Sequence, residues 1–481
     1  MQPQNRHRPN ATTLAAPEPP LWRAAKGVTL VDDEIRDVRS PPAASERLMD
    51  PSYGEAHDPT RPAPEAAGRR VTLFIWSFSG GGVEKMTLRL AGALLGRGFA
   101  VDVVVFRESG PNRKHVPPAA RVVVLRRRWS VAGLAWLARR DAALARRLVG
   151  LRPPAFLRWL PAFADYLRDA RPDLVISAMP RCNLVAAAAR AVLPEAPPTI
   201  LTERNPLGFR LEREPGYARR FGKAVPALYP YGDALVGVSN SVSRDVEATL
   251  GLPRGAVRTI YNPSWSPEIA CRAAEPCPHP WFADAARAAR PVVLGVGRLH
   301  PQKDFPTLAR AFVRLRRDWR GEGPPRLVIL GDVGKGDIRD ALVAIARAGG
   351  VADDLDFPGY VENPYAFMAR AAVLALPSRF EGFPAVPVEA LACGLPVVAA
   401  DTPGGQSEIL EGGRFGRLFP GGDEAALAQA IAETLADPPA PETLRARAAE
   451  FGVDRSTERY LALWREIAGR PDDATLAAAP R

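Results

Sequence analysis

Short apolar runs alternate along this chain with longer segments in which apolar residues recur every three or four positions. The first run covers residues 71–76, and the second covers residues 101–106. Between them, one apolar stripe of a helix is formed by Val83, Met86, Leu90 and Leu94. An apolar run of this length predicts a buried strand, and the stripe predicts an amphipathic helix. The first unit is therefore strand, helix, strand, with its two strands parallel.

The same alternation continues through most of the chain. In the first half, further strands are predicted at 122–125, 174–177, 199–202, 234–238 and 257–261. In the second half, strands are predicted at 291–297, 326–330, 355–357, 373–376 and 397–400. Strands that alternate with helices favour parallel sheets covered by helices on both faces. We therefore expect an α/β protein with two doubly wound parallel sheets.

Length and composition also favour two domains. The chain has 481 residues, of which 47% are hydrophobic, which is more than one ordinary core would hold. Residues 1–70 are rich in proline and alanine and lack a sustained apolar period, so they are predicted to form a disordered tail. The first domain is expected at 71–265 and the second at 291–440, joined by a linker at 266–290. Residues 441–481 are expected to form a helix that packs back on the first domain, followed by a tail.

Cysteine usage and hydropathy exclude several classes of protein. The four cysteines (Cys182, Cys271, Cys277 and Cys393) include no C-x2-C pair, so the sequence predicts neither a zinc site nor a disulfide framework. No apolar stretch approaches 18 residues without a charge, and the first residues lack the apolar core of a signal peptide. We therefore expect a cytoplasmic protein that does not span a membrane.

The positive charge is concentrated in one region. The formal net charge is +11, and residues 71–170 account for it with 17 basic and 6 acidic residues. Within this region, segment 107–158 holds 13 basic and 2 acidic residues, interleaved with Trp129 and Trp136. Such a segment favours an anionic membrane surface, with the protein peripheral on the inner face of the cytoplasmic membrane. Nucleic acid and an ordinary solvated helix face are the alternatives, and no nucleic-acid-binding motif accompanies the segment.

The most specific chemical signal is a pair of glutamates eight positions apart. Glu381 and Glu389 flank the sequence Gly-Phe-Pro-Ala-Val-Pro-Val, between the predicted strands at 373–376 and 397–400. A loop and helix that follow a parallel strand lie at the carboxyl edge of its sheet, where such sheets bind ligands. The spacing lets one glutamate reach the reacting part of a nucleotide-activated substrate while the other reaches its ribose.

With these flanks, the segment resembles the E-x7-E signature of the retaining family-4 glycosyltransferases, which have the GT-B fold. The resemblance covers about residues 71–435. It implies two Rossmann-like, doubly wound parallel-sheet domains facing a cleft, the first on the acceptor side and the second binding a nucleotide sugar. It also implies that Glu381 contacts the donor sugar and Glu389 the ribose. The donor-binding loop between them holds Gly382, Phe383 and Pro384.

A second motif opens the predicted second domain. Gly297 and Arg298 follow its first strand, and Lys303 precedes the next helix, for which Asp304 is the expected N-cap. Two cations at the start of a helix suit a diphosphate, because arginine offers a planar fork and lysine a point charge. In the similar family this pair holds the nucleotide diphosphate and stabilises its charge as it leaves, in place of a metal. No Asp-x-Asp metal motif lies in a suitable loop, so we expect neither a metal nor a cofactor.

A glycine-rich turn lies between the first predicted strand and helix. It contains Gly81, Gly82 and Glu84, and glycines let backbone N–H groups approach a ligand at the positive end of a helix. In the similar family the matching turn lies near the donor phosphates and the acceptor, which would place Glu84 on the acceptor side. Phe357, after a strand of the second domain, resembles the loops that surround the nucleotide base.

One position departs from the family pattern. Many members carry a histidine that contacts the donor sugar, and this chain offers Glu203, Arg204 and Asn205 near that place. The departure leaves open which residue takes the part of the histidine. The segments 239–241 and 261–263 also match the family, and we interpret them as structural turns.

The resemblance implies an enzyme that moves a sugar from a nucleotide donor to a hydroxyl with retained anomeric configuration. The donor would be a UDP-sugar by family frequency. The acceptor would be a glycan or a lipid-linked molecule in polysaccharide or glycolipid synthesis, and no nucleic acid is expected as a partner. A nonhydrolysing nucleotide-sugar epimerase and a catalytically silent membrane-associated scaffold of the same fold are the two alternatives.

Overall fold

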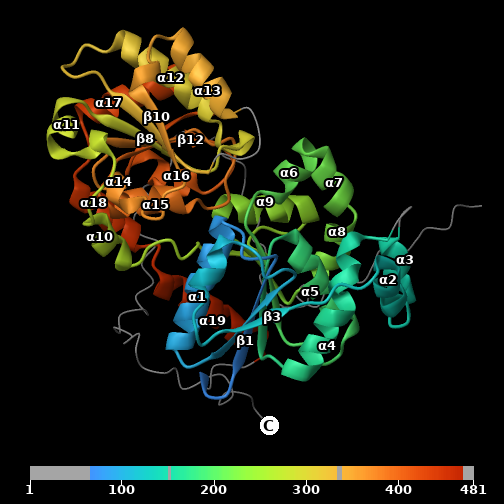
Figure 1. Cartoon of the computed structure of the whole chain (residues 1–481). Helices are drawn as coiled ribbons and strands as arrows, with labels where there is room; N and C mark the ends of the chain where they lie inside the picture. The colour runs from blue at the N-terminus through green and yellow to red at the C-terminus, as the bar shows by residue number, and fades with distance from the viewer. Residues whose placement is uncertain (1–65, 150–152, 333–337, 470–481) are drawn as a thin grey trace, which may run out of the picture. The chain divides into compact units, whose positions relative to one another are not determined.

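The structure, a computed structural model, describes residues 66–149, 153–332 and 338–469 (Figure 1). Residues 1–65 of the predicted disordered tail lie outside the described residues. The tail predicted at the end of the chain, from residue 470 onward, also lies outside them. Within the described part, no helix is long and apolar enough to cross a membrane.

The first domain is built on a seven-stranded parallel sheet with the order β3-β2-β1-β4-β5-β6-β7. Its strands are β1 (Arg70–Ile75), β2 (Ala100–Val105), β3 (Arg121–Val124), β4 (Leu174–Ala178), β5 (Thr199–Glu203), β6 (Ala234–Gly237) and β7 (Val257–Thr259). Nearly every residue of β1, β2, β4 and β5 is buried. A strand covered on both faces must be apolar throughout rather than alternating, which is why short apolar runs identified these strands in the sequence.

Helices lie on both faces of this sheet. They are α1 (Gly82–Gly96), α2 (Ser130–Ala138), α3 (Ala142–Leu148), α4 (Leu160–Ala170), α5 (Pro180–Val192), α6 (Leu207–Arg213), α7 (Pro215–Phe221), α8 (Ala224–Leu228) and α9 (Asn240–Leu250), with the short 3₁₀ helix η5 (Ala155–Trp159) before α4. Leu73 and Ile75 of β1 pack in one cluster with α1, whereas Phe74, between them, packs with α4 and α5. The period of two along the strand thus divides the core between the two faces.

The second domain is built on a six-stranded parallel sheet with the order β10-β9-β8-β11-β12-β13. Its strands are β8 (Val292–Val296), β9 (Arg326–Leu330), β10 (Leu355–Gly359), β11 (Val373–Leu376), β12 (Val397–Asp401) and β13 (Arg417–Pro420). Its helices include α12 (Phe305–Asp318), α13 (Ile338–Ala348), α14 (Tyr365–Met368), α15 (Ala385–Ala392), α16 (Gln406–Ile409), α17 (Glu424–Ala436) and α18 (Pro441–Ala449). These two sheets confirm the predicted fold class.

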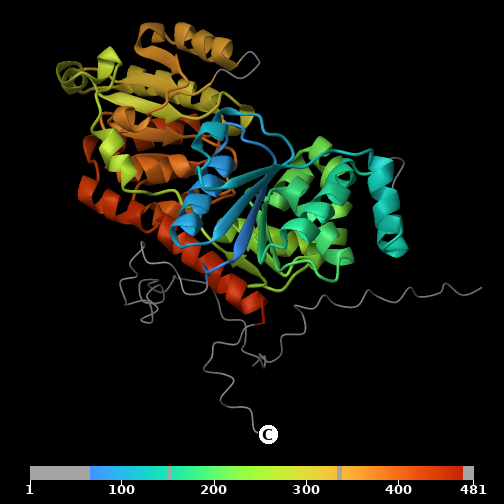
Figure 2. The same ribbon diagram turned by 60° about the horizontal axis from the view of Figure 1, so that its bottom comes forward.

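The last helix of the described chain, α19 (Val453–Ile467), packs against α1 of the first domain (Figures 1 and 2). Tyr460, Leu461 and Trp464 lie in the same core cluster as the apolar face of α1. Buried Arg97, which follows α1, adds ion pairs to Asp454 at 2.9 Å and Glu458 at 3.0 Å. Apolar packing and ion pairs thus hold α19, from the end of the described chain, against the first domain.

Two details go beyond the sequence-based expectation. The segment 266–290, predicted as a linker, contains the helices α10 (Glu268–Ala273) and α11 (Asp284–Ala289). Strand β13 was not predicted, because its sequence Arg-Leu-Phe-Pro holds only two aliphatic or aromatic residues and ends in proline. Pairing with β12 along its whole length nevertheless makes it the edge strand of the second sheet.

Candidate functional site

The two glutamates of the signature lie at the carboxyl edge of the second sheet. Glu381 lies in the loop after β11, and Glu389 lies within α15, for which Pro384 is the N-cap residue. Both side chains are largely buried. Lys303 Nζ lies 2.5 Å from Glu381 Oε1, and the Tyr365 hydroxyl donates to Glu389 Oε1 at 3.1 Å. Each carboxylate is therefore held in place by one polar partner from the same domain.

The two cations predicted to bind a diphosphate, Arg298 and Lys303, follow β8, which is the strand next to β11 in the sheet. Lys303 ends the short 3₁₀ helix η8 (Pro301–Lys303). Two hydrogen bonds connect η8 with the loop that carries Glu381. Gln302 donates through Nε2 to Phe380 O at 3.0 Å, and the Arg379 N–H donates to Gln302 O at 2.9 Å. The loop after β8 is thus joined to the loop after β11, and the two motifs form one constellation.

Neighbouring atoms leave little room for a side chain at two glycines near these cations. A Cβ atom at Gly297 would lie 3.1 Å from Lys303 Cε, and a Cβ atom at Gly331 would lie 1.8 Å from Gly297 O. Asp304 is the N-cap residue of α12, as predicted, but its backbone lies in the left-handed region and its carboxyl accepts from Thr307 Oγ1 at 3.1 Å instead of capping a backbone N–H. Arg298 is exposed, and Phe357 lies half-buried in β10.

The glycine-rich turn of the first domain supplies the next candidates. Gly81 is the N-cap residue of α1, and Gly82 is exposed beside it. Glu84, in the first turn of the helix, is buried and accepts from Ser79 Oγ at 2.5 Å. Burial raises the pKa of Glu84, while the Ser79 bond and the charges of Arg298 and Arg204 oppose the shift. Glu84 of the first domain and Arg298 of the second are thus close enough to interact electrostatically.

The three residues at the position of the family histidine have different environments. Glu203 is buried, accepts from Asn183 Nδ2 at 2.9 Å, and hydrogen-bonds the Tyr229 hydroxyl. Burial raises the pKa of Glu203 to about 7, against the lowering effect of these hydrogen bonds. Arg204 donates to Asn262 Oδ1 at 2.5 Å, and Asn205 is half-buried. Glu203 and Arg204 are both buried and have internal partners, whereas Asn205 is more accessible.

The glutamate loop passes directly against the first domain. A Cβ atom at Gly382 would lie 1.8 Å from Arg204 O, so no larger residue fits there without a shift of the backbone. Asn262 donates through Nδ2 to Phe383 O at 2.9 Å, and the Phe383 ring stacks on Tyr261 with centroids 4.9 Å apart. The segment 261–263, which the sequence suggested was only a turn, therefore also positions the loop that follows Glu381.

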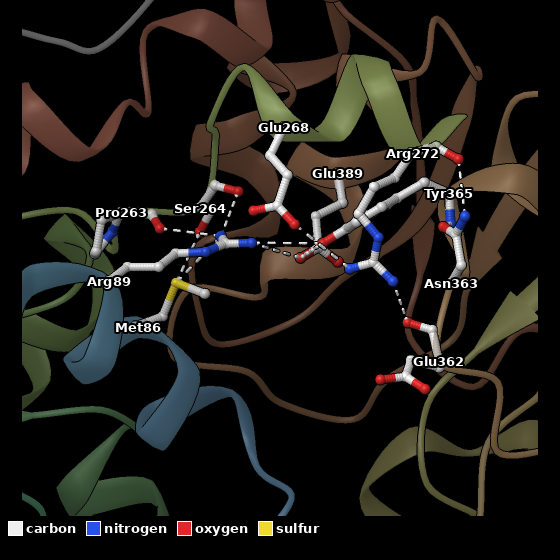
Figure 3. A network of polar contacts seen from close by, with 10 residues as sticks. All are labelled: Met86, Arg89, Pro263, Ser264, Glu268, Arg272, Glu362, Asn363, Tyr365 and Glu389. Atoms are coloured by element: carbon white, nitrogen blue, oxygen red, sulfur yellow. Dashed lines mark hydrogen bonds and ion pairs between the residues drawn. The ribbon is translucent and has the colours of Figure 1, made fainter. Parts of the chain in front are cut away.

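A network around Glu389 was not foreseen from the sequence (Figure 3). Arg89 of α1 lies 3.6 Å from Glu389 Oε1 and donates to the carbonyl oxygens of Pro263 and Ser264 at 3.2 and 2.8 Å. One guanidinium thus contacts the Glu389 carboxylate and the segment that leads into the second domain. No local motif could reveal Arg89, because its partner lies 300 positions away in the chain.

Glu408 forms a second unforeseen link between the domains. Its carboxylate accepts from the backbone N–H groups of Asn240 and Ser241 at 2.9 and 2.8 Å, at the start of α9. Tyr261 donates its hydroxyl to the same carboxylate at 3.0 Å. A carboxylate at a helix start satisfies N–H groups that have no partner within the helix. Within the described part of the chain, no group of three His, Cys, Asp or Glu residues is arranged to hold a metal ion.

Two family models match the chain, one on each domain. The model of Glycosyltransferase Family 4 matches residues 80–263, and the model of Glycosyl transferases group 1 matches residues 282–451. Together these matches contain the glycine-rich turn, the two cations and both glutamates.

Curated relatives match over part of their length. A Campylobacter jejuni protein named N-acetylgalactosamine-N,N'-diacetylbacillosaminyl-diphospho-undecaprenol 4-alpha-N-acetylgalactosaminyltransferase is 30% identical over 44% of this chain and 53% of its own. A D-inositol 3-phosphate glycosyltransferase of Nocardia farcinica is 36% identical over 31% of this chain and 33% of its own. The matched part therefore spans about half or less of these relatives.

Solved structures match across the fold. Anabaena HepE in complex with UDP and glucose superposes with a TM-score of 0.63 at 20% identity, covering 83% of this chain and 100% of that one. At this identity the likeness concerns the fold alone. Two matching family models, two parallel sheets and this structural likeness agree with one another: the chain belongs to the family-4 glycosyltransferases and has the GT-B fold.

Proposed function

We propose that this chain transfers a sugar from a nucleotide-sugar donor to a hydroxyl of a glycan or lipid-linked acceptor, with retention of the anomeric configuration. The observation that carries the proposal is the gathering of Arg298, Lys303, Glu381 and Glu389 at the carboxyl edge of the second sheet. That edge is where open α/β sheets bind nucleotides. A diphosphate next to both cations would place its ribose toward Glu389 and its sugar toward Glu381.

The chemistry divides between positioning and charge stabilisation. The bond between the anomeric carbon and the leaving phosphate oxygen breaks as the acceptor hydroxyl attacks from the same face. The leaving phosphate oxygen takes the acceptor proton, so no separate protein base is needed. Arg298 and Lys303 stabilise the negative charge that develops on the diphosphate, and the 2.5 Å contact with Glu381 fixes the lysine for this task. These cations would do the work that a divalent metal does elsewhere.

The donor is proposed to be a UDP-sugar. The HepE structures were solved with UDP, with UDP and glucose, and with UDP-glucose. A Mycolicibacterium smegmatis relative, 35% identical over 34% of this chain, is named as GDP-mannose-dependent. The nucleotide is therefore a property to be measured, with UDP as the first choice.

The acceptor is proposed to be presented at an anionic membrane surface. Trp129 is 85% exposed and Val131 is 66% exposed at the start of α2, and Arg126, Arg127 and Arg128 precede them. An exposed tryptophan beside arginines suits the boundary between lipid headgroups and acyl chains. The name of the Campylobacter jejuni relative includes a diphospho-undecaprenol group, which supports a lipid-linked acceptor.

Turnover of a panel of nucleotide sugars, with and without EDTA, tests the proposal. We expect release of one nucleoside diphosphate, insensitive to EDTA, and a product whose anomeric proton shows the configuration of the donor. An epimerised nucleotide sugar without transfer would instead support the epimerase, and binding without any turnover would support the silent scaffold. Activity that is lost with EDTA and restored by metal would contradict the role given to Arg298 and Lys303.

A further inference from the structure

The carboxyl edge of the first sheet holds a pocket that the donor site does not include. Its volume is about 410 Å³, within the range of about 300–1,000 Å³ typical of small-molecule sites. The pocket is lined by Phe106, Arg107, Leu125, Arg127, Arg158 and Trp159. The lining therefore combines three guanidinium groups with two aromatic rings and one aliphatic side chain.

Three elements of the fold bring the lining together. Phe106 and Arg107 follow β2 directly, Leu125 and Arg127 follow β3, and Arg158 and Trp159 end η5. The Arg128 N–H donates to Arg158 O at 2.8 Å, which ties the chain after β3 to η5. Since β2 and β3 run parallel to β1, the pocket opens at the same sheet edge as the glycine-rich turn.

The arginines of this pocket lack counter-charges. Elsewhere in the domain, partly buried arginines have carboxylate partners, as Arg190 has Asp233 at 2.8 Å and Arg210 has Glu214 at 2.8 Å. Among the residues that the structure describes, no carboxylate forms an ion pair with Arg107, Arg127 or Arg158. The Arg158 Nε is buried without a hydrogen-bond partner. Arg107 and Arg127 are exposed to solvent and Arg158 is half-buried, so water screens part of their repulsion, and an anion bound among them would reduce the repulsion that remains.

Aromatic rings lie beside the guanidinium groups of Arg107 and Arg158, and Arg158 also donates through Nη2 to Ser130 Oγ at 3.3 Å. Arg107 lies 5.8 Å from the Trp76 ring centroid, and Arg158 lies 5.6 Å from that of Trp159. Arg181, at the start of α5, lies over Trp76 at 4.0 Å. Stacking on a ring orients a guanidinium and leaves its N–H groups available to an oxyanion.

Electrostatic interactions connect the pocket with the proposed acceptor side. Burial lowers the pKa of Arg181, and repulsion from Arg107 and Arg158 contributes to that shift. Burial raises the pKa of its neighbour Cys182, and the charge of Glu84 adds to the increase. Arg181 thus interacts electrostatically with the pocket arginines, and its neighbour Cys182 interacts with Glu84.

We propose that the pocket formed by Arg107, Arg127 and Arg158 binds a phosphate or diphosphate group of the acceptor. This inference rests on the proposed glycosyltransferase function and names the substrate class for its acceptor side. Planar guanidinium forks match phosphate oxygens in bidentate geometry. The apolar wall of Phe106, Leu125 and Trp159 would contact the carbon skeleton next to the phosphate.

The position of the pocket next to α2 fits an acceptor that carries its phosphate on a lipid. Helix α2 packs so closely on η5 that a Cβ atom at Gly133 would lie 1.9 Å from Leu157 O. The exposed Trp129 precedes α2, so the candidate membrane contact and the arginine pocket share one structural unit. A soluble sugar phosphate offers the same anionic chemistry, and the experiment distinguishes the two sources.

Calorimetric titration tests this site in the full chain, with saturating UDP present to occupy the donor cations. The probes are inorganic diphosphate, glucose 1-phosphate and farnesyl diphosphate. We expect diphosphate-containing probes to bind, and Arg107→Gln or Arg158→Gln to weaken binding about tenfold each, which corresponds to about 1.4 kcal/mol. Farnesyl diphosphate binding more tightly than inorganic diphosphate indicates a lipid source, and preference for glucose 1-phosphate indicates a soluble one.

The matched control is Arg254→Gln, which removes an exposed arginine from the segment before β7, at the amino end of the sheet. This variant should bind all probes as the wild type does. Equal loss in the control and the pocket variants would mean general charge attraction and overturn the site, as would UDP binding without any second anion. If UDP itself does not bind, the proposed function fails instead, so the two failures are distinguishable. Circular dichroism of each variant checks that the fold is retained.

Discussion

The two domains share one architecture but differ in how their candidate site residues are paired. In the second domain, Lys303 and Glu381 contact each other, and Glu389 has Tyr365 as a hydrogen-bond partner. In the first domain, Arg107 after β2 and Arg158 of η5 lie beside aromatic rings, and neither they nor Arg127 after β3 has a carboxylate partner among the described residues. A ready-paired site suits a ligand of fixed form, such as a nucleotide diphosphate. A site with unpaired positive charge suits an anionic ligand that supplies the missing counter-charge.

The largest effect on turnover is expected from replacing the Glu381 carboxylate of the second domain. Replacing Glu381 by glutamine removes the charge that positions Lys303 and the side chain proposed to contact the donor sugar. We expect turnover to fall by about 10²–10³, while the protein stays folded because glutamine is isosteric. Initial rates of nucleotide release measure the effect, with Glu322→Gln, an exposed glutamate of the same domain, as the control. Full turnover by Glu381→Gln would remove this residue from the site.

The cations of the second domain should give the next largest effect. Removing Arg298 or Lys303 by alanine substitution takes away a charge-assisted contact to a desolvated phosphate, at a cost of about 2 kcal/mol or more. That cost corresponds to roughly a thirtyfold loss in kcat/KM. The exposed Arg320 of the same domain provides the control variant Arg320→Ala. If both site variants retained wild-type kcat/KM, the diphosphate would have to bind elsewhere.

The buried carboxyl of Glu203 in the first domain should make the free energy of unfolding depend on pH. The pKa of Glu203 is about 7 in the folded protein and about 4.3 in an unfolded chain. The unfolded state therefore releases this proton first as the pH rises, and the free energy of unfolding should fall between about pH 4.5 and 7. The loss is on the order of 4 kcal/mol at 1.36 kcal/mol per pKa unit.

Urea unfolding at pH 5 and pH 8 measures this dependence. Glu203→Gln should reduce the difference between the two pH values, because glutamine does not titrate. Glu195→Gln, an exposed glutamate of the same domain, should leave the difference unchanged. An identical pH dependence in the wild type and Glu203→Gln would show that the stability loss comes from other groups.

The smallest effect is expected on membrane binding, when arginines next to α2 are replaced. Arg139→Gln combined with Arg140→Gln removes two exposed charges next to α2, each worth up to about 1 kcal/mol at an anionic surface. Binding to vesicles that contain anionic lipid should weaken by roughly tenfold, and salt should release the wild type. Sedimentation with anionic and neutral vesicles measures both. Equal affinity for the two vesicle types, or none for either, would make the segment a solvated face.

Sequence patterns located the strands of both sheets and the candidate site residues of the second domain better than the arginine pocket at the edge of the first sheet. Strands buried on both faces are continuous apolar runs, so most were located within a residue or two, whereas β13 was too short and too polar to stand out. Glu381, Glu389, Arg298 and Lys303 stand in two short segments at the ends of strands, and a parallel sheet brings such ends together.

Contacts between distant segments could not be predicted in this way. Arg89 lies on α1 beyond the glycine-rich turn, and only the fold brings it to Glu389. Arg107, Arg127 and Arg158 were visible as part of a basic segment, but their convergence on one pocket depends on β2, β3 and η5 meeting at one edge. Glu203 was a candidate ligand by position, and only its burial reveals its internal partners.

The affinity of UDP for three proteins tests the division of labour between the domains most directly. Equilibrium titration would compare the wild type, Glu389→Gln in the second domain, and Arg107→Gln combined with Arg158→Gln in the first. The account predicts that Glu389→Gln weakens UDP binding by roughly tenfold, as expected for a lost charge-assisted hydrogen bond of about 1.5 kcal/mol, whereas the double arginine variant binds UDP as the wild type does. Loss of UDP affinity in the arginine variant with none in Glu389→Gln would contradict the assignment of the donor to the second domain.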